Sequence, residues 1–439
     1  MNETLLYILG IVIMVFGLAL SIGLHEFGHL IPAKLFGVRV PHWAVGFGPR
    51  LFAKKFGETE YSIRLIPLGG FITLIGMYPP AKPGTDDSRR WFSNAIASAR
   101  QAHSEHIQPG DEGRMLYQLP AYKRIIVMAG GPLVNLLLGL ILVSIALSGI
   151  GPNTRVAKVD EVVQCVEQMV DSNASCDADS EPTPSKLAGL EPGDVVKVVD
   201  GVAIDYRSDP FTAVVQAPDA AHQVVVVRDG KEIALTLKAG MAALPYADGS
   251  GNLAVDSAGQ PLLKQRAFVG VRYAVERSPL SIGASFSAAS QMTSDTLGFI
   301  VQFPIQVYES VAGLVTGAER SPNSAVSIVG ITQFAGTVTA DENSDFADRA
   351  FSNLMLLGSL NLALFAFNMI PLPPLDGGHI AGGVYEYLKR GLYRLLGKAD
   401  PGYADTALLA PVANLMFMVL LLAGLAMILV DILNPLSIG

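Results

Sequence analysis

The pentad His25-Glu26-Phe27-Gly28-His29 follows directly on residues 4–24, a run of 21 residues without a charged side chain. A helix of that length can cross the hydrocarbon core of a bilayer. Two histidines four positions apart lie on one helical face and can share a Zn²⁺ ion, and the glutamate beside them can then take a proton from water. The stretch therefore predicts a membrane-spanning helix that ends in a zinc site.

A structural interpretation of the pentad competes with this one. In it, both histidines are satisfied by hydrogen bonds and Glu26 lies at the membrane edge. An ionised carboxylate in the middle of a membrane costs roughly 2.5–3.5 kcal/mol even on insertion scales, so Glu26 needs a partner there. A metal ion supplies that partner, which favours the zinc site.

The composition is that of a membrane protein with several spans and a polar domain. Of 439 residues, 50% are hydrophobic and 16% are charged. The first span lacks the basic start and the small-residue cleavage site of a signal peptide, so we expect it to be retained. Four charge-free stretches are long enough to span, namely 4–24, 125–154, 350–375 and 406–430.

Basic residues near the span ends predict the orientation of the chain. Residues 35–124 hold 12 basic and 7 acidic side chains, whereas residues 151–353 hold 14 basic and 25 acidic ones. We therefore expect a multi-pass protein of the inner (plasma) membrane, with 35–124 and about 380–405 in the cytoplasm. Residues 151–353 and both termini would lie outside. The net charge of −8 argues against nucleic acid as a partner.

The tracts between the spans differ in character. Alternating, aromatic-rich runs in 38–78, punctuated by glycine and proline, predict short strands and hairpins. An open strand edge there would dock an extended substrate, although a hairpin that only braces the helices fits the pattern equally. Residues 155–278 predict a compact α/β module with a hairpin turn at Asp229-Gly230. Cys165 and Cys176 could close a small loop in this exported tract, and the sequence leaves that pairing open.

The tract 279–349 is weakly amphipathic. Residues 297–315 are apolar enough to be counted as a fifth span. We expect an interfacial helix instead, because Pro304 interrupts the segment and acidic residues bracket it. An extra crossing would also place the two halves of the predicted site on opposite sides of the membrane.

The second half of that site lies in the third span. Three prolines in residues 371–374 end the helix, which in a membrane calls for a functional reason, and Asp376 follows. Spans one and three run in the same direction, so His25 and Asp376 share a depth near the cytoplasmic face. Two imidazoles, one aspartate and one open position make a catalytic type of zinc site, and Asp376 and Glu26 together neutralise the ion.

Several other polar residues are candidates for the site. Asn135, inside the second span, is either a hydrogen-bonding link between helices, which we expect, or a site residue. We expect His379 to support the site from outside the coordination sphere or to lie at the interface, because three ligands and water already fill a tetrahedron. The other histidines, His42, His103, His106 and His222, are expected to be solvated.

These motifs resemble the site-2 proteases, which are intramembrane zinc metalloproteases, here of the bacterial type with a PDZ domain outside. The resemblance covers nearly the whole chain. It is carried by His25-Glu26-Phe27-Gly28-His29, Asn368…Leu375-Asp376-Gly377, Ala188-Gly189-Leu190-x-Pro192-Gly193-Asp194, Gly46-Phe47-Gly48-Pro49, Ile66-Pro67-Leu68-Gly69-Gly70 and Gly131-Pro132-x-x-Asn135.

The resemblance implies a role for each site residue. His25, His29 and Asp376 would be zinc ligands, Glu26 the general base, and Asn368 a residue that holds the substrate backbone or the developing oxyanion. The substrate would be the transmembrane segment of a single-pass protein, such as an anti-sigma factor already cut outside. The PDZ-like domain would filter substrates by size or contact a substrate tail or peptide. The chain departs from the family in having one PDZ-like module and an insertion around its cysteines.

The predicted fold class is thus a multi-pass α-helical membrane protein with about four transmembrane helices, a membrane-associated β-hairpin region and one extracytoplasmic PDZ-like α/β domain. The predicted segments are a first transmembrane helix (1–37), the β-hairpin region (38–78), a cytoplasmic loop (79–124), a second transmembrane helix (125–153), the PDZ-like domain (155–278), an interfacial segment (279–349), a third transmembrane helix with the LDG motif (350–379), a cytoplasmic loop (380–405) and a fourth transmembrane helix (406–432).

Two rival functions remain beside the intramembrane zinc metalloprotease. A metal transporter needs polar residues along a full path, and spans two and four offer almost none. A catalytically inactive PDZ membrane scaffold would not need all of the reactive residues that are present. A soluble zinc protease that merely tethers itself is excluded by the position of the pentad.

Overall fold

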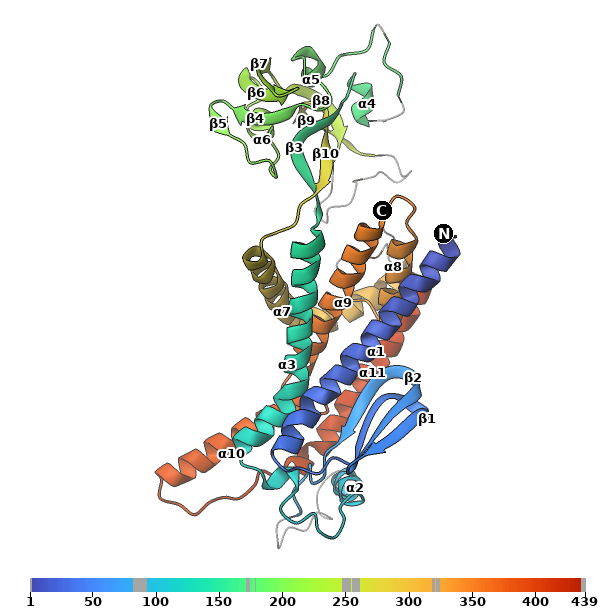
Figure 1. The fold of residues 1–439 in the computed structure, drawn as a ribbon, viewed down its shortest axis with the longest axis vertical. Coiled ribbons are helices and arrows are strands. Elements are labelled where there is room, and N and C mark those ends of the chain that lie inside the picture. Colours follow the sequence, from blue (N-terminus) through green and yellow to red (C-terminus); the bar gives the residue numbers. More distant parts are fainter. Residues whose placement is uncertain are drawn as a thin grey trace. The chain divides into compact units, whose positions relative to one another are not determined.

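A computed structural model of the chain describes residues 2–81, 93–170, 174–177, 179–246, 254, 261–317, 320 and 324–435. The chain forms two compact units (Figure 1). The first comprises Met1–Ile150 and Leu280–Gly439, and the second comprises Gly151–Pro279. The bounds of the second unit thus differ by only a few residues from those of the α/β module predicted at 155–278. Residues 82–92 of the predicted cytoplasmic loop lie outside the described residues.

The first unit is mostly helical (Figure 1). Its helices are α1 (Glu3–Leu35), α2 (Ser93–Ser104), α3 (Ala121–Ile145), α7 (Ile282–Thr316), α8 (Ile328–Ala340), α9 (Phe346–Asn368), α10 (Asp376–Leu395) and α11 (Ala410–Leu433), with the short turns η2 (Leu116–Gln118), η3 (Ala146–Ile150) and η4 (Thr406–Leu409); its strands are β1 (His42–Phe56) and β2 (Thr59–Thr73).

Five helices of the described chain are long and apolar enough to cross a membrane. This confirms that the chain has the character of a multi-pass membrane protein. The five are Glu3–Leu35, Ala121–Ile150, Ile282–Leu314, Phe346–Asn368 and Thr406–Leu433.

Helix α7 corrects one expectation. Pro304 was predicted to interrupt this segment, but it lies inside one continuous helix of 35 residues. A proline removes one backbone hydrogen bond, and in an apolar setting neighbouring groups can compensate, so the helix need not end there. By length and composition α7 is a fifth candidate span. The number of helices that cross the membrane stays a prediction.

Helices α1 and α9 run parallel to each other. Residues along both helices meet in the same order. Gly17 packs against Leu357, and four residues further along each helix the Asn361 side chain donates a hydrogen bond of 2.9 Å to the Ser21 hydroxyl. Helix α8 makes this possible because it packs on the first turns of α1, at Gly10, and returns the chain to that end before α9 begins. The downstream ends of α1 and α9 therefore lie at one depth.

The third predicted span is shorter than expected. Residues 350–379 do not form one helix, because α9 ends at Asn368 and α10 begins at Asp376. Prolines 371, 373 and 374 cannot donate backbone hydrogen bonds, so the helical structure is interrupted between α9 and α10. The predicted loop at 380–405 is also wrong in its first half, since α10 continues to Leu395.

The predicted β-hairpin region contains two long strands that fold back on themselves. Residues 42–45 pair on one side with 60–63 and on the other with 70–73, and residues 50–56 pair with 59–64. Gly46, Gly48 and Gly69 have positive φ at the bends, a conformation that residues with a Cβ rarely adopt. Among the residues that the structure describes, segment 70–73 has a strand partner on one side only, which makes it an edge of this sheet.

The root of the hairpin, which comprises residues 38–45 and 72–75, packs beside the pentad. A buried apolar cluster joins α1, β1, β2 and α3, and includes Leu30, Val40, Trp43, Leu74 and Val127. This packing fixes the hairpin against the end of α1 that carries the histidines.

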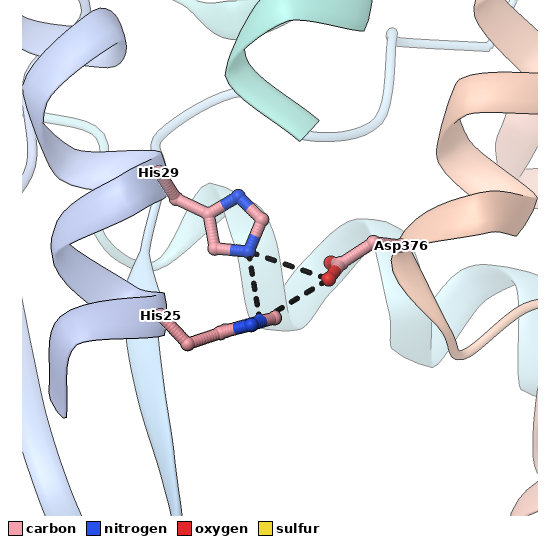
Figure 2. Close-up of side chains that lie close together, drawn as sticks. All are labelled: His25, His29 and Asp376. Atoms are coloured by element: carbon pink, nitrogen blue, oxygen red, sulfur yellow. Dashed lines mark hydrogen bonds and ion pairs between the residues drawn. The ribbon is translucent and has the colours of Figure 1, made fainter. Parts of the chain in front are cut away.

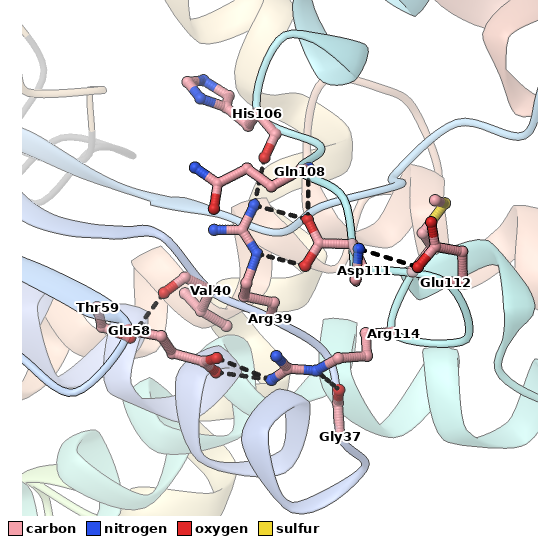
Figure 3. Close-up of polar contacts among 12 residues, drawn as sticks. Gly37, Arg39, Val40, Glu58, Thr59, His106, Gln108, Asp111, Glu112 and Arg114 are labelled. Atoms are coloured by element: carbon pink, nitrogen blue, oxygen red, sulfur yellow. Dashed lines mark hydrogen bonds and ion pairs between the residues drawn. The ribbon is translucent and has the colours of Figure 1, made fainter.

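Two ion pairs connect the hairpin region, residues 38–78, to the segment before α3 (Figure 3). The Arg39 guanidinium contacts both oxygens of Asp111, at 2.7 and 2.8 Å, and both side chains are buried. Arg114 donates to both Glu58 oxygens at 2.9 Å. Burial alone would raise the pKa of Asp111, but the hydrogen bonds from Arg39 and from the Gln108 amide outweigh it and lower that pKa.

The second unit is built on an antiparallel sheet in the order β10-β3-β4-β6-β7, with β5 beside β4. Asp229 and Gly230 have positive φ between β6 and β7, which confirms the predicted hairpin turn. Its elements are β3 (Asn153–Val162), α4 (Glu167–Val170), α5 (Pro184–Leu187), β4 (Val195–Val199), β5 (Val202–Ala203), α6 (Thr212–Gln216), β6 (His222–Arg228), β7 (Lys231–Leu237), β8 (Gly240–Pro245), β9 (Leu263–Phe268) and β10 (Val271–Arg277).

The structure decides two side-chain contacts of this unit, one that the sequence left undecided and one that it predicted wrongly. Cys165 and Cys176 form a disulfide, which answers the question of their pairing. His222 is not solvated: its side chain is 7% exposed, and Nδ1 lies 2.6 Å from a carboxylate oxygen of Asp200. The hydrogen bond to Asp200 is the main reason that the pKa of His222 is raised, and the same bond lowers the pKa of Asp200.

The raised pKa of His222 predicts how the stability of the second unit depends on pH. The protonated imidazole stabilises the fold fully below the unfolded-state pKa of about 6.5, and the contribution is lost as pH rises through the folded-state value. Protection of the β6 amides from hydrogen exchange, corrected for intrinsic rates, should therefore fall as pH rises above about 6.5. His222→Gln should flatten this slope and the exposed Lys231→Gln should keep it. An unchanged slope in His222→Gln would contradict the assignment.

Candidate metal centre

Two histidines of α1 form one side of the site (Figure 2). His25 and His29 are four residues apart and therefore share a face of the helix. Both are buried, at 9% and 4% exposed, and their Nε2 atoms lie 3.2 Å apart. The rings meet edge to face, with centroids 4.8 Å apart. Two imidazole nitrogens thus point at one small volume.

Asp376 closes the site from another helix. It is the first residue of α10, directly after the proline-containing break at the end of α9. Its Oδ2 atom lies 3.2 Å from Nε2 of His25 and 3.4 Å from Nε2 of His29 (Figure 2). Within the described part of the chain, these three residues are the one group of histidine, cysteine and acidic side chains found close enough together to hold a metal ion.

The spacing of the three atoms fits a tetrahedral Zn²⁺ ion. Zn–N and Zn–O bonds of about 2.0–2.1 Å at tetrahedral angles place ligand atoms about 3.3 Å apart. The observed edges of 3.2, 3.2 and 3.4 Å match that value. Oδ2 of Asp376 is also buried and accepts no hydrogen bond of good geometry, although two imidazoles surround it. A cation at the centre of the triangle would satisfy it.

The other nitrogen of each imidazole is held from α3. Nδ1 of His29 lies 2.8 Å from the Val127 carbonyl oxygen, to which it can only donate, so Nε2 is left with a lone pair for a metal. Nδ1 of His25 lies 3.2 Å from the side-chain amide of Asn135. The Oδ1 atom of that amide is buried without a partner. Turning the amide over would let Oδ1 accept from Nδ1–H, so that His25 also presents a free Nε2.

Asn135 was expected to link helices, and the structure shows that its link is to His25 itself. The side chain is 1% exposed, inside an otherwise apolar helix. In the sequence, the feature that singles out this residue is a polar amide within an apolar span. That feature fits a link between helices and a site residue equally well. Only the rotation of α3 against α1 distinguishes a general helix link from a contact to the site.

Glycines let α3 approach the histidines this closely. A Cβ on Gly28 would collide with the Gly130 backbone, and one on Gly130 would collide with Gly28. A Cβ on Gly131 would strike Nε2 of both histidines, at 2.7 Å for His25. The two helices therefore cross at backbone contact distance, and the space that the imidazoles occupy exists because residue 131 has no side chain.

Glu26 lies between the histidines and the edge of the sheet. It is 8% exposed and follows His25 on α1. Its Cγ is 3.1 Å from the position that a Cβ on Gly70 would take, so the carboxylate side of the site adjoins edge segment 70–73. The pentad glutamate is thus close both to the candidate metal site and to a strand edge.

The remaining predicted residues lie nearby but outside the triangle. Asn368 is the last residue of α9, and its side chain donates 3.1 Å to the Leu364 carbonyl of the same helix. His379 is one turn beyond Asp376 on α10, with its ring 6.3 Å from that of Tyr78.

Comparison with known proteins shows which family the chain resembles. A family model described as peptidase family M50 matches residues 13–396. Zinc metalloprotease Rip1 of Mycobacterium tuberculosis is 29% identical over 441 residues, which cover 99% of this chain and 100% of the relative. Zinc metalloprotease Rip1 of Mycolicibacterium smegmatis is 28% identical over 98% of each chain, and metalloprotease MmpA of Caulobacter vibrioides is 25% identical over 87% of each.

Gly131→Ala should weaken Zn²⁺ binding by roughly 10–100-fold, the range found when groups that support metal ligands are disturbed. The added methyl group would push both Nε2 atoms out of the triangle. Gly424→Ala on α11 is the matched control, because a Cβ there meets nothing within 4 Å. Competition with a chelator on the purified proteins measures both affinities. Equal affinity in Gly131→Ala and wild type would show that α3 does not confine the imidazoles.

Proposed function

We propose, since this chain belongs to peptidase family M50, that it hydrolyses a peptide bond inside the transmembrane segment of single-pass membrane proteins. Membership makes the chain a zinc metalloprotease with Zn²⁺ as its cofactor. The observation that carries the finer proposal is the triangle of His25, His29 and Asp376, formed by the candidate span α1 and by the start of α10, a few residues after the candidate span α9.

His25, His29 and Asp376 hold the ion in this proposal. Two neutral imidazoles and one carboxylate leave the fourth tetrahedral position open, which is the pattern of catalytic rather than structural zinc. The contacts to Val127 and Asn135 orient the two rings. With Glu26 ionised, the divalent ion and the two carboxylates sum to zero charge, which suits a buried position.

Glu26 is the general base. Zinc, when bound, polarises the scissile carbonyl and makes a coordinated water more acidic. Glu26 takes the water proton and passes it to the leaving amine, and its position beside His25 puts it within reach of both. Asn368 would hold the substrate backbone or the developing oxyanion, for which its side chain must release the Leu364 carbonyl.

The edge segment 70–73 is the substrate dock. The carbonyls of a transmembrane helix are hydrogen-bonded within the helix, so the substrate must unwind before attack. Pairing with the free side of this edge gives the unwound backbone new hydrogen-bond partners. Because Gly70 adjoins Glu26, a strand added there runs past the general base. This supports substrate docking over a purely bracing role for the hairpin.

The topology follows from charge and depth. We place the 151–279 unit and both termini outside the inner membrane, because the acidic residues concentrate in that tract and the basic ones lie between the first two spans. The site then lies near the cytoplasmic face. The outer unit acts as a PDZ-like filter or tail contact, and the substrates are proteins such as anti-sigma factors already cut outside.

Two substitutions separate chemistry from metal binding. Glu26→Gln should keep Zn²⁺ at full stoichiometry and lower cleavage of a reconstituted single-span substrate by about 10²–10⁴-fold, the usual contribution of a general base. Asp376→Ala should lose both zinc and cleavage while the chain still inserts. Metal analysis and gel-based cleavage in liposomes measure the two quantities.

Glu112→Gln, which alters an exposed acid of the loop before α3, is the control and should match wild type. Cleavage at the wild-type rate by Glu26→Gln would remove it as the base, and full zinc in Asp376→Ala would remove that ligand. A wild-type protein that binds zinc and cleaves nothing would favour the scaffold, and zinc flux across the liposome would favour the transporter.

Strand addition predicts a period of two in the substrate. N-methylation of successive backbone amides near the scissile bond should lower kcat/KM at alternate positions only, because alternate amides of an added strand point toward the edge. Each lost hydrogen bond should cost about 1 kcal/mol, or about fivefold. A uniform decline, or a period between three and four, would show that the substrate binds in another way.

A further inference from the structure

Helix α10 carries an apolar stripe that is exposed in the part of the chain that the structure describes. Its members recur at spacings of three and four residues and are between 41% and 86% exposed. They are Val384, Tyr385, Leu388, Leu392 and Leu395, continued by Leu396 directly after the last residue of the helix. This spacing aligns them on one face of the helix.

The opposite face of α10 is fixed to the protein. Glu386 is 1% exposed and lies 2.5 Å from the Arg124 guanidinium of α3. It also accepts the Ala404 backbone N–H at 2.8 Å. Arg390, one turn later, pairs with Asp400 at 3.0 Å and lies over the Tyr403 ring. These contacts set the rotation of α10, so the apolar stripe must face away from the protein.

The composition and course of α10 suit a membrane surface. The helix carries Glu386, Lys389, Arg390 and Arg394 and is not among the five candidate spans. In Figure 1 it lies beside the lower end of α3 and extends outward from the other helices. An amphipathic helix with a basic polar face, placed across the ends of spanning helices, is typical of the lipid interface.

The charge at the borders of the stripe is positive. Arg124 neutralises Glu386, whereas Lys389, Arg394 and Lys398 form no ion pair with an acid among the described residues. The Lys389 ammonium lies 5.5 Å above the Tyr385 ring. Both residues also line a cavity of about 570 Å³ beside the proline-containing break, together with Pro371, Pro373 and Thr406. The cavity lining also includes Asp405, whose carboxylate is paired with Arg100 at 2.7 Å, so Lys389 is the cation available to a lipid headgroup there.

We propose that α10 binds the anionic phospholipid leaflet at this end of the spanning helices. The stripe enters the boundary of the acyl chains, and Lys389, Arg394 and Lys398 contact the headgroup phosphates. Because Asp376 is the first residue of the same continuous helix, this contact also holds the carboxylate against the two imidazoles. This second part rests on the ligand role proposed above for Asp376.

The first test asks which lipid lies against the stripe. A fluorophore is attached at Leu392→Cys in the full-length protein, where the two natural cysteines are joined in a disulfide and leave one thiol to label. In nanodiscs, spin-labelled phosphatidylglycerol should quench it more than spin-labelled phosphatidylcholine at equal mole fraction. The local preference should reach about fivefold for each basic side chain at the surface, or about 1 kcal/mol.

Charge variants identify the headgroup partners. Lys389→Gln with Arg394→Gln should bring the two quenching efficiencies together. Lys231→Gln with Lys264→Gln, which removes two exposed charges from the 151–279 unit, should leave the preference intact. Equal quenching by both lipids in the otherwise unaltered protein, or quenching by neither, would overturn the proposal.

The second test asks whether the lipid contact of α10 helps to keep Asp376 in place, and it measures the rate of zinc loss. Zinc loss to a chelator should be several-fold slower in nanodiscs with phosphatidylglycerol than in phosphatidylcholine alone, and Lys389→Gln with Arg394→Gln should abolish the difference. Equal rates in the two lipids would overturn the link between α10 and the site. Neither test uses cleavage, so failure of the proposed protease function would leave these two readouts unchanged.

Discussion

A buried carboxylate oxygen between two imidazole nitrogens is the constraint on which the rest of the first unit depends. Oδ2 of Asp376 lies within 3.4 Å of Nε2 of His25 and of His29, yet it accepts no hydrogen bond of good geometry. An ionised group in that position is costly unless a cation completes it. A metal ion at the centre of the three atoms would compensate that charge, so the arrangement suits a metal site, and such a site requires the helices that carry it to be held in register.

Three structural features hold that register. The parallel course of α1 and α9 brings the third ligand to the depth of the histidines, with the Ser21–Asn361 contact between them. The glycine contact at Gly28 and Gly130 lets α3 approach until Val127 and Asn135 reach the imidazoles. The proline-containing break then ends α9, so that Asp376 can turn inward at the start of a new helix.

The same packing connects the metal site to two surfaces. On one side, the hairpin root packs on α1 and places the edge segment 70–73 beside Glu26. On the other side, Asp376 opens an amphipathic helix whose polar face is bound by Arg124 of α3. The site thus lies between an edge suited to an extended peptide and a helix suited to a lipid surface. Both surfaces therefore contain residues next to the candidate site, Gly70 beside Glu26 and the helix that begins at Asp376.

Several details could not be predicted from sequence for identifiable reasons. Whether Asn135 contacts a helix or a histidine depends on the rotation of α3, and whether Pro304 ends α7 depends on groups around it. The loop expected after residue 379 is a helix whose basic residues obscured its apolar stripe. His222 was expected to be solvated because its partner, Asp200, lies 22 residues away on another turn. The contacts of Asn135 and His222 join segments distant in the chain, whereas the helix after residue 379 was missed in a local pattern.

Local patterns by themselves determined that this chain has apolar helices of membrane length, a His-Glu-x-x-His face, a hairpin turn at Asp229-Gly230 and an acid after a proline break. Spacing and backbone preference decide such features within a few residues, so no partner is needed to recognise them. Only the tertiary structure decided that His25, His29 and Asp376 meet within 3.4 Å, that Asn135 faces the site and that α10 turns its apolar side outward. Those outcomes depend on how helices rotate and approach one another, which is set by packing across hundreds of residues.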